Sequence, residues 1–194
     1  RSVGKLSQGL SLGVATGFDS GSTLDYVYRN QAQGFGPVGR MMDRVYLDSI
    51  GWRGIRARKL NLEKLLKAAI DDTHRAGKPV RIVDIAAGHG RYILDTLGTL
   101  KDIEFKALLR DYSPLNVSQG LALITEKGLR TRVCFEQGDA FDQASLAALQ
   151  PRPSIAVVSG LYELFPDNSL LRSSLAGLAQ ALGQGDYLLY TNQP

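Results

Sequence analysis

The sequence predicts an α/β protein with a doubly wound, mostly parallel sheet and helices on both of its faces. Two observations support this fold class. Short apolar runs typical of buried strands alternate with segments of helical periodicity from residue 80 onward. The first run breaks into the small-residue turn 86–90, and a helical segment follows. Strands that alternate with amphipathic helices pair in parallel, because each helix returns the chain to the same end of the sheet.

Five strands and five helices are predicted in chain order. The strands cover residues 80–86, 104–109, 132–136, 154–159 and 186–191. The helices cover residues 60–76, 91–99, 114–127, 143–149 and 168–182. The first helix ends at Gly77-Lys78-Pro79, because glycine favours the backbone of a helix end and proline cannot continue a helix. Ser113 and Asp142 are predicted N-caps, since their side chains can accept free N–H groups of the following turn.

The residues before the first strand divide into two segments. Residues 1–22 are rich in glycine and serine, which is typical of a linker-like lead-in, and the start at Arg1 suggests a piece of a longer polypeptide. Residues 23–79 are predicted to form an N-terminal helical extension. Apolar residues recur there at helical spacing, namely Val38, Met41, Met42, Val45 and Tyr46.

Composition favours a cytoplasmic protein without a membrane span or a metal site. The chain has no run of about eighteen apolar residues, and no signal-peptide pattern opens it. The single cysteine, Cys134, lies in a predicted strand and is interpreted as a small buried apolar residue. His74 and His89 do not form a metal-ligand set.

The net charge of +4 is concentrated in the first part of the chain. Residues 1–80 carry thirteen Lys and Arg against seven Asp and Glu, whereas residues 81–194 carry ten against twelve. The densest basic run is RGIRARK at 53–59. A solvated loop leading into the next helix is the favoured interpretation of this run. A nucleic-acid patch, an anionic substrate or a membrane surface are the alternatives.

Glycine spacing in the turn 86–90 separates two classes of nucleotide ligand. The dinucleotide fingerprint G-x-G-x-x-G would require glycine where the chain has Ala86 and Arg91, so NAD binding is disfavoured. The spacing acid-x-G-x-G-x-G matches at Asp84, Gly88 and Gly90 and departs at Ala86. This pattern resembles the first motif of class I S-adenosylmethionine-dependent methyltransferases. The resemblance implies that this turn lines the methionine part of the cofactor, S-adenosyl-L-methionine, and that Asp84 helps to hold its amino end.

The end of the second predicted strand carries an acid suited to a ribose. Asp111 lies about twenty residues beyond the glycine turn, where nucleotide-binding α/β folds place a carboxylate against ribose hydroxyls. One carboxylate can accept hydrogen bonds from both the 2′ and 3′ hydroxyls. Tyr112 follows it directly and is assigned to the same cofactor site.

The third and fourth strand ends complete the predicted cofactor site. The resemblance implies that Asp139, with the adjacent Ala140, contacts the adenine amino group. It also implies that Ser159 and Gly160 lie beside the methyl group that is transferred. Because ligands bind outside the carboxyl ends of parallel strands, all four strand ends are expected to converge on one crevice.

The candidate catalytic residues follow from the chemistry of methyl transfer. Displacement at a sulfonium methyl needs little acid–base chemistry, so positioning and exclusion of water can supply most of the rate. A base is needed where the acceptor must lose a proton early, and Tyr162, Glu163 and Tyr28 are the candidates. Methyltransferases of this class commonly close the substrate pocket with N-terminal helices, which makes Tyr26, Tyr28 and Arg40 candidates for substrate contact.

Four segments together resemble one family of bacterial methyltransferase domains, found C-terminal to an α/β-hydrolase domain in one polypeptide. The segments are DSGSTLDYVYRN at 19–30, DIAAGHGRY at 84–92, LLRDYSPLNV at 108–117 and SGLYELFPDN at 159–168. The resemblance implies a Rossmann-like fold, with the S-adenosylmethionine-binding domain at 80–194. That domain would be C-terminally incomplete, because the last two of the usual seven strands are absent. It also implies a fused hydrolase domain and a small-molecule or lipid-like substrate.

Other functions fit parts of the sequence. A module that binds the cofactor without transferring a methyl group would carry the same strand-end motifs. A nucleic-acid methyltransferase would use the basic run 53–59, and an NAD-dependent oxidoreductase is disfavoured by the glycine spacing. The sequence therefore favours in-line methyl transfer to an unidentified small-molecule or lipid-like acceptor.

Overall fold

The computed structural model describes residues 6–191, which fall into two compact units. The first unit extends to Asn61 and the second begins at Leu62. The division lies inside the long helix α4 (Ile50–Arg75), whereas the boundary expected from the sequence lies between residues 79 and 80. Helix α4 begins ten residues before the predicted start at 60, so the basic run 53–59 is helical and the favoured loop interpretation is wrong.

The N-terminal unit is helical from close to its start. It contains α1 (Gln8–Thr16), α2 (Gly21–Arg29), α3 (Gly36–Leu47) and the first part of α4. The linker predicted at 1–22 is therefore wrong for its described residues. Two serines of this segment are helix caps: Ser7 accepts a hydrogen bond from the Leu10 N–H, and Ser20 accepts one from the Thr23 N–H.

A small apolar core holds these helices together. Tyr26, Val27 and Leu47 are buried in it, and Trp52 packs against it from the first turns of α4. Tyr26, a candidate for substrate contact in the sequence, is 1% exposed and is a core residue here. Arg40 is exposed on α3, at the surface of this unit.

A buried carboxylate organises the polar part of the same unit. Asp43 on α3 is fully buried and accepts hydrogen bonds from the Ser7 and Tyr26 hydroxyls and from the backbone N–H groups of Gly9 and Gln33. Burial raises the pKa of Asp43, but these donors outweigh that effect and hold it below its ordinary value of 3.8. One side chain thus ties α1, α2, α3 and the loop before α3 together.

Asp43→Asn is expected to lower the free energy of unfolding of this unit by about 3 kcal/mol, because an amide nitrogen would face donors that now meet a carboxylate oxygen. The carboxylate's contribution is present above the ordinary pKa and is lost as the pH falls through the lowered pKa of the folded state. Denaturant unfolding followed by the fluorescence of Trp52, the single tryptophan, measures this directly. Asp48→Asn, at the exposed C-cap of the same helix, is the matched control. Equal losses of unfolding free energy for the two variants would contradict the organising role of Asp43.

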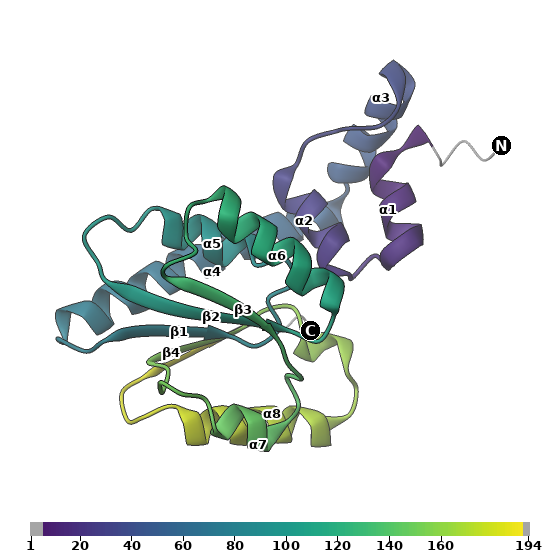
Figure 1. Ribbon diagram of the computed structural model, residues 1–194. Helices are drawn as coiled ribbons and strands as arrows, with labels where there is room; N and C mark the ends of the chain where they lie inside the picture. Colours follow the sequence, from purple (N-terminus) through teal and green to yellow (C-terminus); the bar gives the residue numbers. More distant parts are fainter. Residues whose placement is uncertain (1–5, 192–194) are drawn as a thin grey trace. The chain divides into compact units, whose positions relative to one another are not determined.

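The second unit is a five-stranded parallel sheet in the order β3-β2-β1-β4-β5. Its strands are β1 (Val80–Asp84), β2 (Phe105–Asp111), β3 (Val133–Gln137), β4 (Ile155–Val158) and β5 (Tyr187–Tyr190). Helices α5 (Arg91–Gly98) and α6 (Pro114–Glu126) cover one face, and α7 (Gln143–Ala147) and α8 (Asn168–Ala181) cover the other (Figure 1). The predicted doubly wound α/β fold and the alternation of its elements are confirmed.

The core between the sheet and α7 and α8 is continuous and apolar. Strand β4, which lies between β1 and β5, is buried along its whole length, and Val83, Ile85, Leu146 and Leu178 pack in the same cluster. Cys134 lies outside this core and is exposed, so the prediction that it is buried is wrong. The strand order places its strand, β3, at the edge of the sheet, and the five-residue α7 is too short to cover it.

Candidate functional site

The glycine turn connects β1 to α5 at the carboxyl edge of the sheet. Gly88 and Gly90 have φ angles of 58° and 75°, a left-handed conformation that side chains disfavour. A Cβ at Gly90 would also lie 2.7 Å from the Leu109 side chain, so this position has no room for one. The half-buried Ala86 lies at the start of the turn. At Gly88 and Gly90 the turn therefore offers backbone to an approaching ligand, while His89 between them is its one large side chain.

Asp84, at the end of β1, forms hydrogen bonds that fix the start of this turn. It is fully buried and accepts hydrogen bonds from the Ala86 N–H, at 3.1 Å, and from the hydroxyl of Tyr92 on α5. Burial, with a smaller contribution from the nearby Asp111, raises the pKa of Asp84 to about 7 against the lowering effect of these two donors. The carboxylate is thus committed to shaping the turn, and its direct contact with a cofactor amino group stays a prediction.

Asp111 joins the end of β2 to the glycine turn. Its Oδ2 accepts the Gly88 N–H at 2.8 Å, while its Oδ1 accepts the Ser113 N–H and the Asn116 side-chain amide, each at 2.9 Å. A carboxylate has about four acceptor positions, so one on Oδ2 stays available. The residue is buried, with 8% of its surface exposed. This geometry suits a carboxylate that receives a ligand hydroxyl beside the turn.

The end of β3 carries an accessible acid. Asp139 is exposed, and its Oδ1 accepts the Phe141 N–H at 2.8 Å, while the adjacent Ala140 is buried. The Gly138 N–H donates to the Asp111 backbone carbonyl at 3.0 Å, which ties this loop to the end of β2. Tyr112, also at the end of β2, is 75% exposed and presents an aromatic surface at the same edge.

The residues after β4 divide between the site edge and the core. Ser159 and Gly160 are half-buried, and the Gly160 N–H donates to the Thr191 hydroxyl at 2.9 Å. Tyr162 is buried, and its hydroxyl bonds that of Ser174 on α8 at 2.9 Å. Burial raises the pKa of Tyr162, and the Ser174 hydrogen bond lowers it in part. This placement favours a packing role for Tyr162, and its predicted role as a base stays a prediction.

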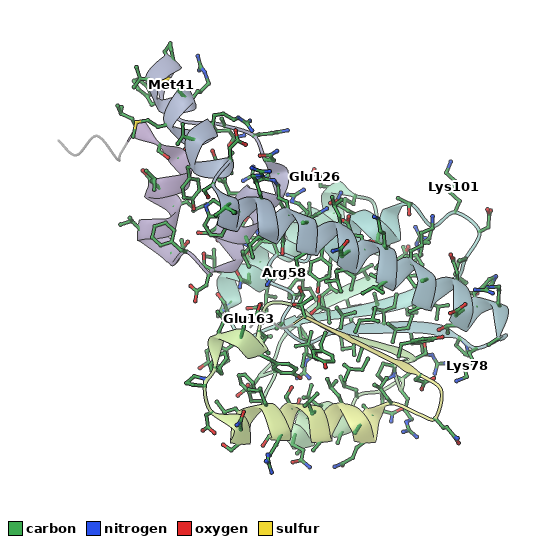
Figure 2. The ribbon with its side chains drawn as sticks, turned by 180° about the vertical axis from the view of Figure 1, so that it is seen from behind. Met41, Arg58, Lys78, Lys101, Glu126 and Glu163 are labelled. Atoms are coloured by element: carbon green, nitrogen blue, oxygen red, sulfur yellow. The ribbon has the colours of Figure 1, made fainter. Side chains whose placement is uncertain are left out.

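The other two candidate bases occupy different units. Glu163 is half-buried on the short 3-10 helix η2 (Tyr162–Leu164), between β4 and α8 (Figure 2). Tyr28 is half-buried on α2 of the N-terminal unit. Each stays a prediction.

Sequence reasoning missed four residues that contact the predicted site. Tyr92 bonds Asp84, Asn116 bonds Asp111, Thr191 bonds the Gly160 N–H, and Arg110 lies beneath Gly138. Two of them carried a usable signal. Asn116 is a polar residue in the first turn of the helix after the strand-end acid, and Arg110 is a charge at the end of an apolar strand.

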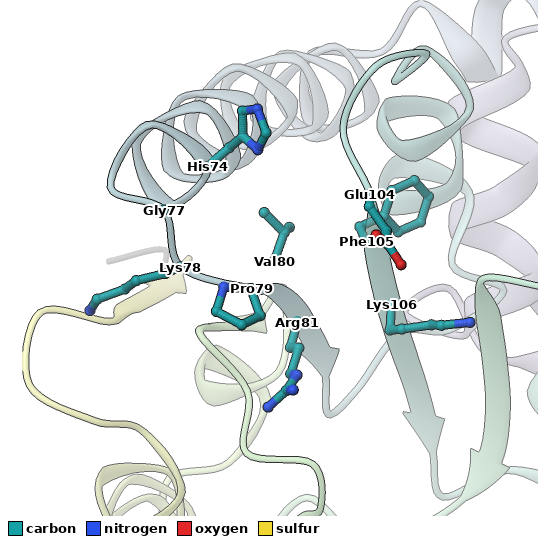
Figure 3. Close-up of a pocket in the computed structure, with 9 residues that line it drawn as sticks. All are labelled: His74, Gly77, Lys78, Pro79, Val80, Arg81, Glu104, Phe105 and Lys106. Atoms are coloured by element: carbon teal, nitrogen blue, oxygen red, sulfur yellow. The ribbon is translucent and has the colours of Figure 1, made fainter.

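A depression at the opposite, amino end of the strands lies outside this set of residues (Figure 3). It has a cavity volume of about 510 Å³ and lies between the end of α4 and the starts of β1 and β2. Figure 3 shows Lys78, Arg81 and Lys106 diverging from its centre. Lys78 pairs with Asp186 at 3.0 Å. These side chains do not converge on a ligand.

Two searches of the described residues concern other classes of site. Within residues 6–191, His, Cys, Asp and Glu form no group of three that could hold a metal ion. None of the helices in this range combines the length and the apolar character that crossing a bilayer requires.

Known proteins similar in sequence cover the whole chain. The model of a family described as "Putative methyltransferase" matches residues 1–194. The uncharacterized protein YnbC of Escherichia coli (strain K12) is 58% identical over 191 residues, which are 98% of this chain and 32% of that protein. The chain thus spans about a third of that relative's length.

Solved structures share the fold at low sequence identity. A possible exported protein from Bordetella parapertussis has a TM-score of 0.66 at 15% identity, over 86% of this chain and 53% of that one. A SAM-dependent methyltransferase from Thiobacillus denitrificans, in complex with S-adenosyl-L-homocysteine, has a TM-score of 0.50 at 21% identity, over 67% of this chain and 47% of its own. These likenesses show a Rossmann-like fold. Because the family model matches the chain over its full length, the chain belongs to this methyltransferase family.

Proposed function

We propose that the protein transfers a methyl group from S-adenosyl-L-methionine to a small-molecule or lipid-like acceptor. The observation that carries this proposal is the hydrogen bond from the Gly88 N–H to Asp111. It places a strand-end carboxylate with one available acceptor position directly beside the backbone of two glycines in left-handed conformation. A ribose and the chain attached to its 5′ carbon need these two features side by side.

The residues present fit the cofactor part by part. The backbone of Gly88 and Gly90 would receive the methionine portion, and Asp111 would accept ribose hydroxyls. Asp139, exposed at the neighbouring strand end, has an acceptor oxygen for the adenine amino group, with Ala140 and Tyr112 beside it. Ser159 and Gly160 would border the reacting end. When bound, the cofactor supplies an electrophilic methyl group on a positively charged sulfur.

The chain's own contribution is mainly positional. An acceptor oxygen, nitrogen or carbon would attack the methyl carbon in line with the departing sulfur, so the protein must align two reactants and exclude water. Glu163 is the candidate to accept a proton from an acceptor that must lose one. Tyr162 is less suited to this step, because it is buried and its hydroxyl is bonded to Ser174.

The setting of the reaction is also a proposal. The chain spans about a third of its E. coli relative, which leaves room for the α/β-hydrolase domain that the sequence resemblance implies. A hydrolase of lipid esters in the same polypeptide would favour a lipid-like acceptor, and we place the protein in the cytoplasm.

Calorimetric titration of the full-length protein tests the cofactor assignment. S-adenosylhomocysteine and S-adenosylmethionine are expected to bind at one site per chain, whereas NAD is expected to give no saturable heat. Transfer of labelled methyl to a panel of small-molecule and lipid acceptors then separates an enzyme from a binding module. Saturable NAD binding without S-adenosylhomocysteine binding would overturn the proposal. Methylation of RNA or DNA in preference to the panel would overturn the acceptor class.

A further inference from the structure

Arg110 is a buried cation that the proposed reaction does not use. It lies in β2 directly before Asp111 and is 5% exposed, on the face of the sheet opposite to its neighbour's side chain. A guanidinium loses strong hydration on burial, and a buried ion pair is weak evidence for added stability. Its Nη1 has no hydrogen-bond partner among residues 6–191. A cation held this way needs an explanation other than the stability of the sheet.

The contacts of its side chain lie on both sides of the loop between β3 and α7. Nη2 donates to the Ser145 hydroxyl on α7 at 2.7 Å, and Nε lies 3.1 Å from a Glu136 carboxylate oxygen on β3. The guanidinium also fills the space beside Gly138, where a Cβ would lie 2.4 Å from both Nε and Nη2. Arg110 therefore contacts the chain on both sides of residues 139–142.

This loop carries the exposed Asp139. At one end the Gly138 N–H donates to the Asp111 carbonyl at 3.0 Å, and at the other Asp142 caps α7 through the Ser145 N–H at 3.0 Å. Ser145 is thus both the residue capped by Asp142 and the partner of Arg110. The loop is anchored to β2 by the backbone of Asp111 and by the side chain of Arg110.

We propose that Arg110 is a positioning residue that holds Asp139 at the distance from Asp111 needed to recognise adenine, and so sets the base selectivity of the cofactor site. The proposal rests on the proposed function. Asp111 and Asp139 must span the ribose and the 6-amino group of one adenosine, and the loop anchored by Arg110 fixes that span. Arg110 contacts the loop, and the two acids contact the ligand.

Base selectivity can be measured separately from affinity. S-inosylhomocysteine differs from S-adenosylhomocysteine by a carbonyl oxygen in place of the 6-amino group, and a carboxylate at Asp139 would repel that oxygen. A site built around a ligand hydrogen bond rejects analogues that cannot make it. The wild-type protein is expected to bind the adenosyl compound about 100-fold more tightly than the inosyl compound.

Arg110→Met keeps much of the side-chain volume and removes the charge and the Ser145 contact. We expect it to reduce the adenosyl-over-inosyl ratio by about 10-fold or more, while affinity for the inosyl compound changes by less than about 3-fold. Arg130→Met, the same change at an exposed position before β3, is the matched control and should leave the ratio unchanged. Asp139→Asn should reduce the ratio by itself, and adding Arg110→Met to it should cause little further loss.

Two milder variants keep the test available if Arg110→Met does not fold. Ser145→Ala removes one contact of the guanidinium, and Gly138→Ala places a methyl group where the guanidinium lies. Both should lower the same ratio. If every variant that folds weakens the binding of both ligands equally, the role of Arg110 is a general structural one and the positioning proposal is overturned. Failure of the wild type to bind either compound would instead overturn the proposed function.

Discussion

Asp111→Ala is expected to weaken the binding of S-adenosylhomocysteine by about 100-fold, the effect of losing a hydrogen bond from a ligand to a buried charged group. The variant removes more than a ribose contact. The Gly88 N–H would lose its acceptor at 2.8 Å, and the Ser113 N–H and Asn116 amide would lose theirs. The glycine turn would then be free to depart from the shape that receives the methionine portion.

Calorimetric titration of full-length wild type and variant gives the two dissociation constants. Asp102→Ala removes the same charge from an exposed position in the loop before β2, at the other end of the strands, and is the matched control. Circular dichroism melting of each variant separates loss of the fold from loss of the site. Equal affinities for wild type and a folded Asp111→Ala would sink the ribose assignment and, with it, the observation on which the proposed function rests.

Asp84→Asn is expected to remove most of a pH dependence of stability from the sheet unit. Burial raises the pKa of Asp84 to about 7, so near neutral pH the folded state holds a proton that the unfolded chain has already lost. The folded state binds more protons, and the free energy of unfolding therefore falls as the pH rises from the ordinary value of 3.8 toward the raised one. Between about pH 5 and about pH 8 this loss amounts to roughly 2 to 3 kcal/mol.

An asparagine keeps the geometry while it removes the titration. Its amide oxygen can accept the Ala86 N–H and its amide nitrogen can donate to the Tyr92 hydroxyl. Urea unfolding of both proteins across this pH range should show wild type losing stability relative to the variant, which becomes the more stable of the two at the alkaline end. Parallel pH profiles for the two proteins would contradict the raised pKa.

Much of the sheet unit was predictable because its signals are local. Short stretches of neighbouring residues decide the conformation of three features. These are the apolar run of β1, the glycine turn after it and the N-cap at Asp142. Strand alternation with helices then leaves a parallel sheet as the expected arrangement. Placing Asp84, Asp111 and Asp139 at strand ends needed no more than this.

The environment of individual side chains was not predictable in this way. Cys134 is a small apolar residue in a predicted strand, yet that strand is an edge strand, and Tyr162 follows a strand end like a site residue, yet its hydroxyl bonds α8. The serines at 7 and 20 match a linker in composition, yet each caps a helix. The environments of Cys134 and Tyr162 depend on distant elements. The two caps are local, because each serine accepts the N–H three residues further along the chain.

The sequence by itself determined the order of strands and helices from residue 80 onward, the small-residue turn after the first strand and the acids at three strand ends. The tertiary structure decided which of those acids hold the glycine turn and which is accessible to solvent. Asp84 is buried beneath the turn, and Asp111 links the turn to β2. Asp139 is exposed on a loop anchored by Arg110. The reason is physical. Backbone conformation follows from residues near in sequence, whereas burial and hydrogen-bond partners are set by which distant elements the sheet brings together.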